Sequence, residues 1–412
     1  MGAQATKAIP QLGSSKDGHI YVQFDQRSYY PGETVTGRIC LHLVNQLSGA
    51  TLLLKMNAHE KVLLSETVHT TRKRNDRTEH ETTYKLKDEK QEFVNFSYPV
   101  YTWNHISPGQ YAIPISFLLP QNLPGSFYSK GSGFLSEISY YVTAELVKST
   151  SSRYDRNDGK LQCIEKFHVK SGMTRPPGAN AKEAYLGIKT CCKKQGNVGL
   201  VMTLKKDILG VGEKVRVVVD VDNTNCDIDI HSVFCEIVQS VTLKAQGKTV
   251  TKEVSAQRQN GGSVAKGQTS EKIFELTVPE CQEGEIEEGL EKNRSDTAYK
   301  LAYQGFPQNT SILTTKGHLI ESTHQIRVYC SMDKSCTTSP SLCVPITLIK
   351  EQIQDDLIYA PSLEWNPEIL NSVNIAANFQ DTGLNYAPTL EQGMFPGNMD
   401  EFNQMLNHKK NI

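Results

Sequence analysis

The chain is built from short segments in which hydrophobic and polar residues alternate, and helical spacing of hydrophobic residues is nearly absent. A period of two places successive side chains on opposite faces, so each segment predicts a β-strand with one buried face. Pro, Gly, Asn and Ser clusters separate the segments, a pattern typical of an antiparallel β-sandwich. The strands predicted in the first half are 19–25, 35–44, 50–58, 92–100, 111–119, 138–147 and 161–169, and the second half repeats the pattern from about 198 to 349.

The two halves begin in the same way. A Gly-Glu pair at 32–33 precedes one alternating strand, and a Gly-Glu pair at 212–213 precedes another. Two further pairs of similar segments follow in the same order, 108–120 with 266–279 and 136–144 with 320–328. A shared order of segments distinguishes a duplication from chance similarity between strands. The sequence therefore predicts two tandem β-sandwich domains.

A segment rich in Pro and Gly, 171–181, separates the two halves and predicts the domain boundary. At 412 residues the chain can hold two domains of ordinary size and a tail, each domain with an adequate core. The predicted division is a flexible arm at 1–16, an N-terminal domain at 17–170, a linker or hinge at 171–197, a C-terminal domain at 198–350 and a flexible tail at 351–412.

Two long polar loops are predicted at 69–82 and 281–311, and loops on a rigid sandwich are common binding sites. The tail is rich in Asn, Pro, Gln and Asp, which favours an unpacked segment. An alternative hypothesis is that it folds back across a domain as an autoinhibitory strand. Near its end, one side of a short helix would carry four tail docking candidates, unless this end frays: Met399, Phe402, Met405 and Leu406.

The charge balance and the cysteines narrow the classes of function. The formal net charge is −1, so the whole-chain balance gives no argument for nucleic acid binding. The ten cysteines form no C-x-x-C pair, which leaves neither a zinc site nor a disulfide framework predicted. We find no signal-peptide pattern and no apolar run long enough for a bilayer. The expectation is a reduced, cytoplasmic protein.

Catalytic patterns are also missing from the sequence. The eleven histidines and many serines form no nucleophile elbow, H-E-x-x-H motif or P-loop. We therefore predict a protein that is not an enzyme and has no catalytic residues, no metal and no cofactor.

Several ordered motifs resemble those of the arrestin-domain family. They are Tyr30-Pro-Gly-Glu-x-Val-x-Gly-x-Ile, then Pro108-Gly-x-Tyr-x-Ile-Pro-Ile-x-Phe-x-Leu-Pro120, Leu123-Pro-Gly-Ser-Phe127 and Ile138-Ser-Tyr-Tyr-Val-Thr-Ala in the first half, with Gly212-Glu-x-Val and Val344-Pro-Ile-Thr-Leu in the second. The resemblance spans roughly residues 17 to 350 and is closer to the α-arrestin, or arrestin-domain-containing, branch than to visual arrestins.

This resemblance implies two cupped β-sandwiches joined at a hinge and a non-enzymatic adaptor. Such an adaptor would link membrane-protein cargo or receptors to trafficking or ubiquitination machinery, with a ubiquitin ligase or coat and adaptor proteins as partners. It would lie in the cytoplasm or peripherally on endosomal or plasma membranes. The alternative is a stable structural subunit of a trafficking complex, similar to the arrestin-fold component of retromer.

Two departures from the family pattern limit what the resemblance implies. The tail has Tyr359-Ala-Pro-Ser and Tyr386-Ala-Pro-Thr in place of the Pro-Pro-x-Tyr motif that recruits a ubiquitin ligase in α-arrestins. The first strand, 19–25, has no match to the adjacent lysines that sense receptor phosphate in visual arrestins. Neither ligase recruitment through that motif nor phosphoreceptor recognition is predicted.

Three residues are lipidation candidates. Gly2, followed by Thr6, fits the N-myristoylation pattern. One myristoyl chain gives only reversible membrane binding, so a second signal is expected. Cys191 and Cys192, flanked by lysines, could be palmitoylated, or they could be ordinary strand or linker residues.

The densest basic cluster lies in the predicted loop 69–82 and consists of Arg72, Lys73, Arg74 and Arg77. It could contact an anionic membrane surface or acidic cargo tails, or it could be a solvated run of charge.

Overall fold

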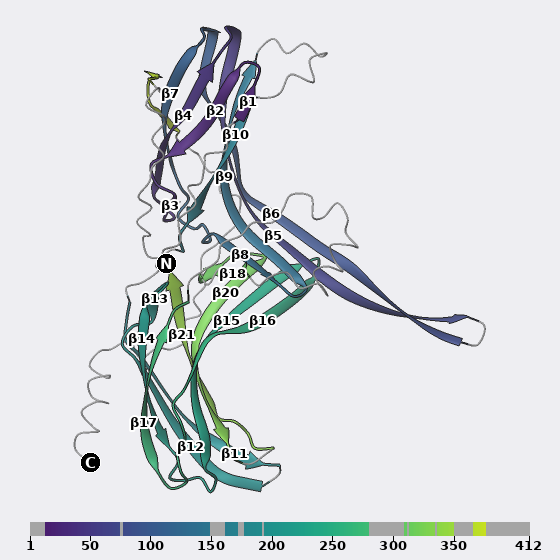
Figure 1. The fold of residues 1–412 in the computed structure, drawn as a ribbon, viewed down its shortest axis with the longest axis vertical. Coiled ribbons are helices and arrows are strands. Elements are labelled where there is room, and N and C mark those ends of the chain that lie inside the picture. The colour runs from purple at the N-terminus through teal and green to yellow at the C-terminus, as the bar shows by residue number, and fades with distance from the viewer. Residues whose placement is uncertain are drawn as a thin grey trace, which may run out of the picture.

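A computed structural model shows that the chain folds into two β-sandwiches, and it contains no helix in the residues that it describes (Figure 1). The described residues are 13–74, 77–148, 161–171, 177–191, 193–279, 309–310, 313–333, 336–349 and 366–375. The prediction of an all-β chain with two tandem sandwiches is confirmed.

The first sandwich has a six-stranded and a seven-stranded sheet. In the six-stranded sheet, β1 (Gly13–Ser15), β2 (Gly18–Phe24), β4 (Thr34–Leu43) and β7 (Gly109–Leu118) lie in this order, and β22 (Glu368–Ile369) and β23 (Val373–Ile375) both pair with β7. The seven-stranded sheet contains β3 (Ser28–Tyr29), β5 (Leu47–Arg74), β6 (Arg77–Ile106), β8 (Phe127–Gly131), β9 (Phe134–Lys148), β10 (Leu161–Val169) and β18 (Asn309–Thr310).

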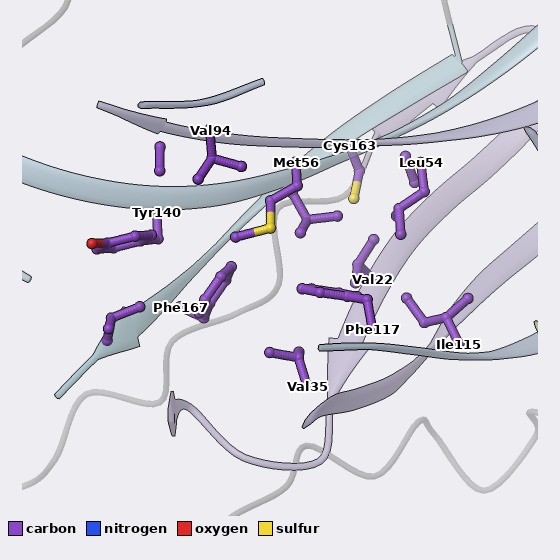
Figure 2. Close-up of a cluster of buried hydrophobic side chains, with 14 of the residues drawn as sticks. Val22, Val35, Leu54, Met56, Val94, Ile115, Phe117, Tyr140, Cys163 and Phe167 are labelled. Carbon is purple, nitrogen blue, oxygen red and sulfur yellow. The ribbon is translucent and has the colours of Figure 1, made fainter. Parts of the chain in front are cut away.

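Side chains from both sheets meet in the first core (Figure 2). Phe167 on β10 lies at its centre, with its ring centroid 6.4 Å from that of Phe117 on β7 and 5.9 Å from that of Tyr140 on β9. These three aromatic side chains are almost entirely buried, as the alternation of β7 and β9 predicts. Aromatic pairs at these separations contribute stabilisation beyond the area that they bury.

The second sandwich has a four-stranded and a six-stranded sheet. The four-stranded sheet is β11 (Asn180–Thr190), β12 (Lys193–Leu204), β14 (Lys214–Asp222) and β17 (Thr269–Thr277). The six-stranded sheet contains β13 (Ile208–Gly210), β15 (Ile230–Ala245), β16 (Lys248–Asn260), β19 (Thr315–Lys316), β20 (Ile320–Met332) and β21 (Ser341–Ile349).

The duplication extends to the hydrogen bonds of the opening turns. Gly32 and Gly212 have φ angles of 82° and 79°, in the left-handed region that favours glycine. Glu33 accepts from the amide of Tyr30 at 2.7 Å, and Glu213 accepts from the amide of Gly210 at 2.8 Å. The two carboxylates therefore close equivalent turns, and the Gly-Glu pair has a structural role in both halves.

The predicted loop at 69–82 is wrong for the residues that the structure describes, since β5 and β6 continue as a long antiparallel ribbon with paired residues from Leu47↔Ile106 to Arg74↔Arg77. Its outer part is polar on both faces, which leaves no hydrophobic alternation to signal a strand. Hydrogen bonds between the two strands satisfy their backbone N–H and C=O groups, so the ribbon forms without a buried hydrophobic face.

Three segments predicted to lack regular structure also contain strands. β1 lies in the predicted arm 1–16, β11 in the predicted linker 171–197, and β22 with β23 in the predicted tail 351–412. Each pairs at the edge of an existing sheet, where a neighbouring strand supplies the hydrogen bonds. Local composition does not reveal such partners.

Candidate functional site

The two sandwiches meet where the β15–β16 hairpin lies against β5 and β6 (Figure 1). Val241, Leu243 and Ala245 from β15 join the hydrophobic core of the first sandwich, together with Leu319 and Ile320. All five side chains are buried. The hydrophobic core of the first sandwich therefore extends into the junction. Burial of these apolar side chains stabilises one arrangement of the two domains.

A buried carboxylate lies at the centre of this junction. Glu60 on β5 is fully buried, and its two oxygens accept hydrogen bonds from three consecutive backbone amides of the second sandwich. The donor–acceptor distances are 2.9 Å from His318, 2.6 Å from Leu319 and 3.2 Å from Ile320. Such charge-assisted bonds are stronger than neutral ones. Glu60 therefore fastens β5 to the turn between β19 and β20.

The turn that holds Glu60 requires glycine at position 317. A Cβ atom added to Gly317 would lie 2.0 Å from Oε1 of Glu60. The backbone amide of Gly317 also donates to the carbonyl of Ile320 at 2.7 Å, which closes the turn. The turn and the carboxylate are consequently matched in shape as well as in hydrogen bonding.

Two further contacts connect the domains beside Glu60. The hydroxyl of Thr315 donates to the carbonyl of Gly125 at 3.0 Å, and the hydroxyl of Ser171 donates to the carbonyl of Thr314. β18 pairs with β8, so a strand from the second half of the chain completes a sheet of the first sandwich. Chain segments from both halves are interleaved at the junction.

The buried His324 lies behind the same turn. Its Nδ1 lies 3.0 Å from the hydroxyl of Thr314, and that hydroxyl accepts from the amide of Leu348 at 2.9 Å. Nε2 has no hydrogen-bond partner among the described residues. Burial lowers the pKa of His324 to about 3.

The lowered pKa of His324 predicts a loss of stability in mild acid. The folded pKa of about 3 lies below the ordinary value of 6.5, so between these values the unfolded chain binds a proton that the folded chain does not. Stability is therefore full above pH 6.5 and falls by about 1.4 kcal/mol per pH unit below it, or about 2 kcal/mol at pH 5. We expect His324→Gln to remove this component in urea unfolding at pH 7.5 and pH 5.

Comparing the free energy of unfolding at pH 7.5 and pH 5 separates the effect of His324 protonation from a loss of packing in the variant. Burial is also the main cause that lowers the pKa of His59, to about 4, so His324→Gln should retain part of the wild-type slope. An identical pH dependence in His324→Gln and wild type would contradict the assignment.

The β5–β6 ribbon extends away from both sandwiches (Figure 1). β9 pairs with β5 only as far as Leu64↔Phe134, and the amide of Ser65 still donates to the carbonyl of Gly133, so residues 66–74 pair with β6 alone. Lys87 and Lys248 each place Nζ 3.4 Å from a carboxylate oxygen of Glu66, and these contacts fix the base of the ribbon. Beyond Glu66, β5 runs for about 25 Å at the ordinary rise per residue.

The basic candidates lie at the outer end of this ribbon. The backbone register opposes Arg74 with Arg77, Lys73 with Thr78 and Arg72 with Glu79. The fold therefore brings the four basic residues, Arg72, Lys73, Arg74 and Arg77, to one end of a projecting element. Sequence reasoning identified the residues, but their distance from the domains depends on the strand pairing.

Residues 366–375 of the tail lie along an edge of the six-stranded sheet of the first sandwich. Glu368 and Ile369 of β22 pair in parallel with Tyr111 and Ala112, and β23 continues along the same edge of β7. Ile375 is 1% exposed and belongs to the core of the first sandwich. Residues 366–375 are thus a packed strand addition, whereas the tail docking candidates Met399, Phe402, Met405 and Leu406 lie outside the described residues.

The lipidation candidates are only partly covered by the structure. Cys191 is exposed in the turn between β11 and β12. Gly2 and Cys192 lie outside the described residues. Their modification remains a prediction.

The described part of the chain contains no group of three or more His, Cys, Asp or Glu side chains that could hold a metal ion. In the same residues, no helix is long and apolar enough to span a membrane.

Sequence reasoning missed Glu60 and Ile375. The signal for Glu60 was present, because Met56, Ala58 and Val62 share its face of β5, which leaves one carboxylate in a buried alternation. Ile375 follows Val373 in an alternation of only three residues within a segment rich in Asn and Pro, which is too short to predict a strand.

Comparison with known proteins agrees with the two-sandwich architecture. Residues 19–170 match the family model described as "Arrestin (or S-antigen), N-terminal domain", and residues 194–353 match the model described as "Arrestin (or S-antigen), C-terminal domain". The chain is also 25% identical over 210 residues to "Arrestin domain-containing protein A" of Dictyostelium discoideum. That match covers 50% of this chain and 35% of the relative, so it spans about a third of the relative's length.

Proposed function

Because this chain belongs to the arrestin-domain family, we propose that it is a non-enzymatic adaptor that links membrane-protein cargo to trafficking or ubiquitination machinery. Members of this family are generally adaptors without catalytic activity, and the two family domains together are the observation that carries the proposal. Its partners would be cargo or receptors and coat or adaptor proteins. A ubiquitin ligase would require a contact other than a Pro-Pro-x-Tyr motif.

Three features of the fold support an adaptor. The Glu60 junction holds the sandwiches together as one scaffold, the β5–β6 ribbon presents a long surface, and β7 accepts a parallel strand. Extended segments commonly bind a sheet edge of this kind through backbone hydrogen bonds. A scaffold with separate contact elements can bring two partners together without chemistry at a catalytic site.

The proposed location is peripheral, on an anionic endosomal or plasma membrane surface. Arg72, Lys73, Arg74 and Arg77 at the end of the ribbon would contact lipid headgroups, and acylated Gly2 would supply an anchor. Cys191 and Cys192 would be the second acylation site. Basic residues near an anionic surface contribute about 1 kcal/mol each, so two of them decide whether a weakly anchored protein stays bound.

Two measurements of membrane binding test this proposal, one with vesicles and one by fractionation of cells. In the cell experiment the protein carries a tag at its carboxyl end, so that the amino terminus stays free. We expect Arg74→Ala with Arg77→Ala to weaken binding to vesicles of phosphatidylcholine and phosphatidylserine about 30-fold, as two lost contacts of about 1 kcal/mol predict. In cells we expect Gly2→Ala to move the protein from the membrane pellet to the soluble fraction. The matched control is Lys272→Ala, on β17 away from the ribbon.

Crosslinking and mass spectrometry on the same cells test the adaptor function itself. Recovery of membrane proteins together with coat or ubiquitin machinery supports it, and recovery of neither would defeat it. A stoichiometric complex that stays intact on gel filtration would favour the structural-subunit alternative. If both the wild type and the two variants remain soluble, the peripheral location is wrong.

A further inference from the structure

Cys191 occupies a position that does not favour cysteine. Thr190 pairs with Lys193, and Cys191 lies in the turn between β11 and β12. Cys191 has a φ angle of 52°, in the left-handed region where hairpin turns prefer Asn or Gly. A cysteine in this conformation therefore costs free energy that Asn or Gly would largely avoid.

A second exposed cysteine lies directly opposite this turn. Thr190 forms an isolated antiparallel bridge with Thr337, and their hydroxyl oxygens are 2.9 Å apart. The amide of Cys191 donates to the carbonyl of Cys336 at 3.1 Å, and the amide of Thr338 donates to the carbonyl of Lys189 at 3.0 Å. These two bonds flank the Thr190–Thr337 pair, so Cys191 and Cys336 are the next opposed residues.

The spacing of this pair suits a covalent bond. A backbone hydrogen bond of 3.1 Å between the Cys191 amide and the Cys336 carbonyl holds the two Cα atoms within about 7 Å, and disulfides span Cα separations of about 4.4–6.8 Å. Cys336 also has a left-handed backbone, with a φ angle of 60°. Among the described non-glycine residues only three have a positive φ, and this pair supplies two of them.

We propose that Cys191 and Cys336 form a reversible disulfide that joins the β11–β12 turn to the segment between β20 and β21. With hydrogen peroxide as oxidant, the first thiolate attacks one peroxide oxygen, the O–O bond breaks, and a sulfenic acid and water result. The second thiolate then attacks the sulfenic sulfur, the S–S bond forms, and a second water leaves. Two thiols are oxidised and one peroxide is reduced to two waters.

Solvent exposure distinguishes Cys191 and Cys336 from most of the other described cysteines. Cys191 and Cys336 are exposed, whereas Cys163, Cys235 and Cys330 are buried. Burial raises the pKa of each of these three thiols to about 12, which keeps them protonated and unreactive.

The bond would connect the two sheets of the second sandwich, because β11 belongs to the four-stranded sheet and β20 and β21 belong to the six-stranded sheet. An oxidised Cys191 could not also carry an acyl chain. Oxidation and the proposed acylation of Cys191 are therefore mutually exclusive states of the same thiol.

Peptide mapping of the full chain tests the proposal. After treatment with one equivalent of hydrogen peroxide and trypsin digestion without reductant, we expect the 190–193 peptide to be joined to the peptide that follows Lys334. Dithiothreitol should separate them, and Cys191→Ser and Cys336→Ser should each abolish the product. Cys343 lies on the same tryptic peptide as Cys336, and Cys192 lies beside Cys191, so Cys343→Ser and Cys192→Ser are the controls that should retain the product.

Thermal unfolding shows whether the bond fits the native fold. We expect oxidation to raise the Tm of the second sandwich by about 4 °C or more, and dithiothreitol or Cys336→Ser to remove the increase. The proposal is overturned if the crosslink is missing, if it needs Cys192 or Cys343, or if oxidation lowers the Tm.

Discussion

Glu60→Ala is expected to lower the free energy of unfolding by about 3–5 kcal/mol, because it leaves two buried amide donors and one partly buried amide donor without an acceptor. If the sandwiches separate before they unfold, the same loss will appear as domain separation. Urea unfolding measures the first effect. Small-angle scattering, together with hydrogen exchange at Leu319 and Ile320, measures the second, and we expect exchange at these amides to rise at least 100-fold.

Two other carboxylate variants separate the role of Glu60 from a general effect of charge. Glu60→Gln preserves the shape and one acceptor oxygen, but it turns an NH2 group towards amide donors, so an intermediate loss is expected. Glu66→Ala removes a partly exposed partner of Lys87 and Lys248 and should cost much less than Glu60→Ala, because solvent screens exposed ion pairs. Equal effects of Glu60→Ala and Glu66→Ala would contradict a special role for Glu60.

A further variant approaches the same contact from the other domain. Gly317→Ala places a Cβ atom against Oε1 of Glu60 and should therefore open the junction without removing the carboxylate. If hydrogen exchange at the amides of Leu319 and Ile320 is unchanged in this variant, the close fit between Gly317 and Glu60 does not hold the turn in place.

The second large effect concerns the tail strand. Ile375→Glu is expected to release β23 from β7, because a charged group would replace a side chain that is 1% exposed in the core. Loss of a buried Ile side chain costs about 2–3 kcal/mol before the penalty for the carboxylate. Amide exchange in residues 366–375 should therefore increase at least 100-fold relative to wild type.

Ile369→Glu is the matched control, since Ile369 lies in the same docked segment but is 74% exposed. It should leave the exchange rates nearly unchanged. Exchange at the full rate of an unfolded peptide in the wild-type tail would contradict the docking of this segment. If the tail is autoinhibitory, Ile375→Glu should also increase binding of cargo, and unchanged binding would defeat that hypothesis.

Much of the fold follows from residue patterns that act over short distances. The alternation of Val215, Val217, Val219 and Val221 specifies which face of β14 is buried, and the Gly-Glu pairs specify their turns. Such signals work because side-chain direction in a strand has a period of two and because a left-handed turn position favours glycine. They also identify the family through the order of the motifs.

The candidate site was predictable only in part. The sequence pointed to the basic residues at 72–77 and to Cys191, but placed the former in a loop and gave the latter no partner. Glu60, Gly317 and His324 act through residues far away in the chain, so no local spacing connects them. The outer ribbon also escaped prediction because paired polar strands need no hydrophobic alternation.

By itself the sequence determined an all-β chain with two duplicated sandwiches, the strands with a buried face and the membership of the arrestin-domain family, since each depends on periodicity or on ordered motifs. Only the tertiary structure decided that Glu60 joins the domains, that β22 and β23 pair with β7, and that Cys336 lies opposite Cys191. Each of these contacts joins residues that are distant in the chain. It forms only when folding brings their strands together, so no local pattern in the sequence predicts it.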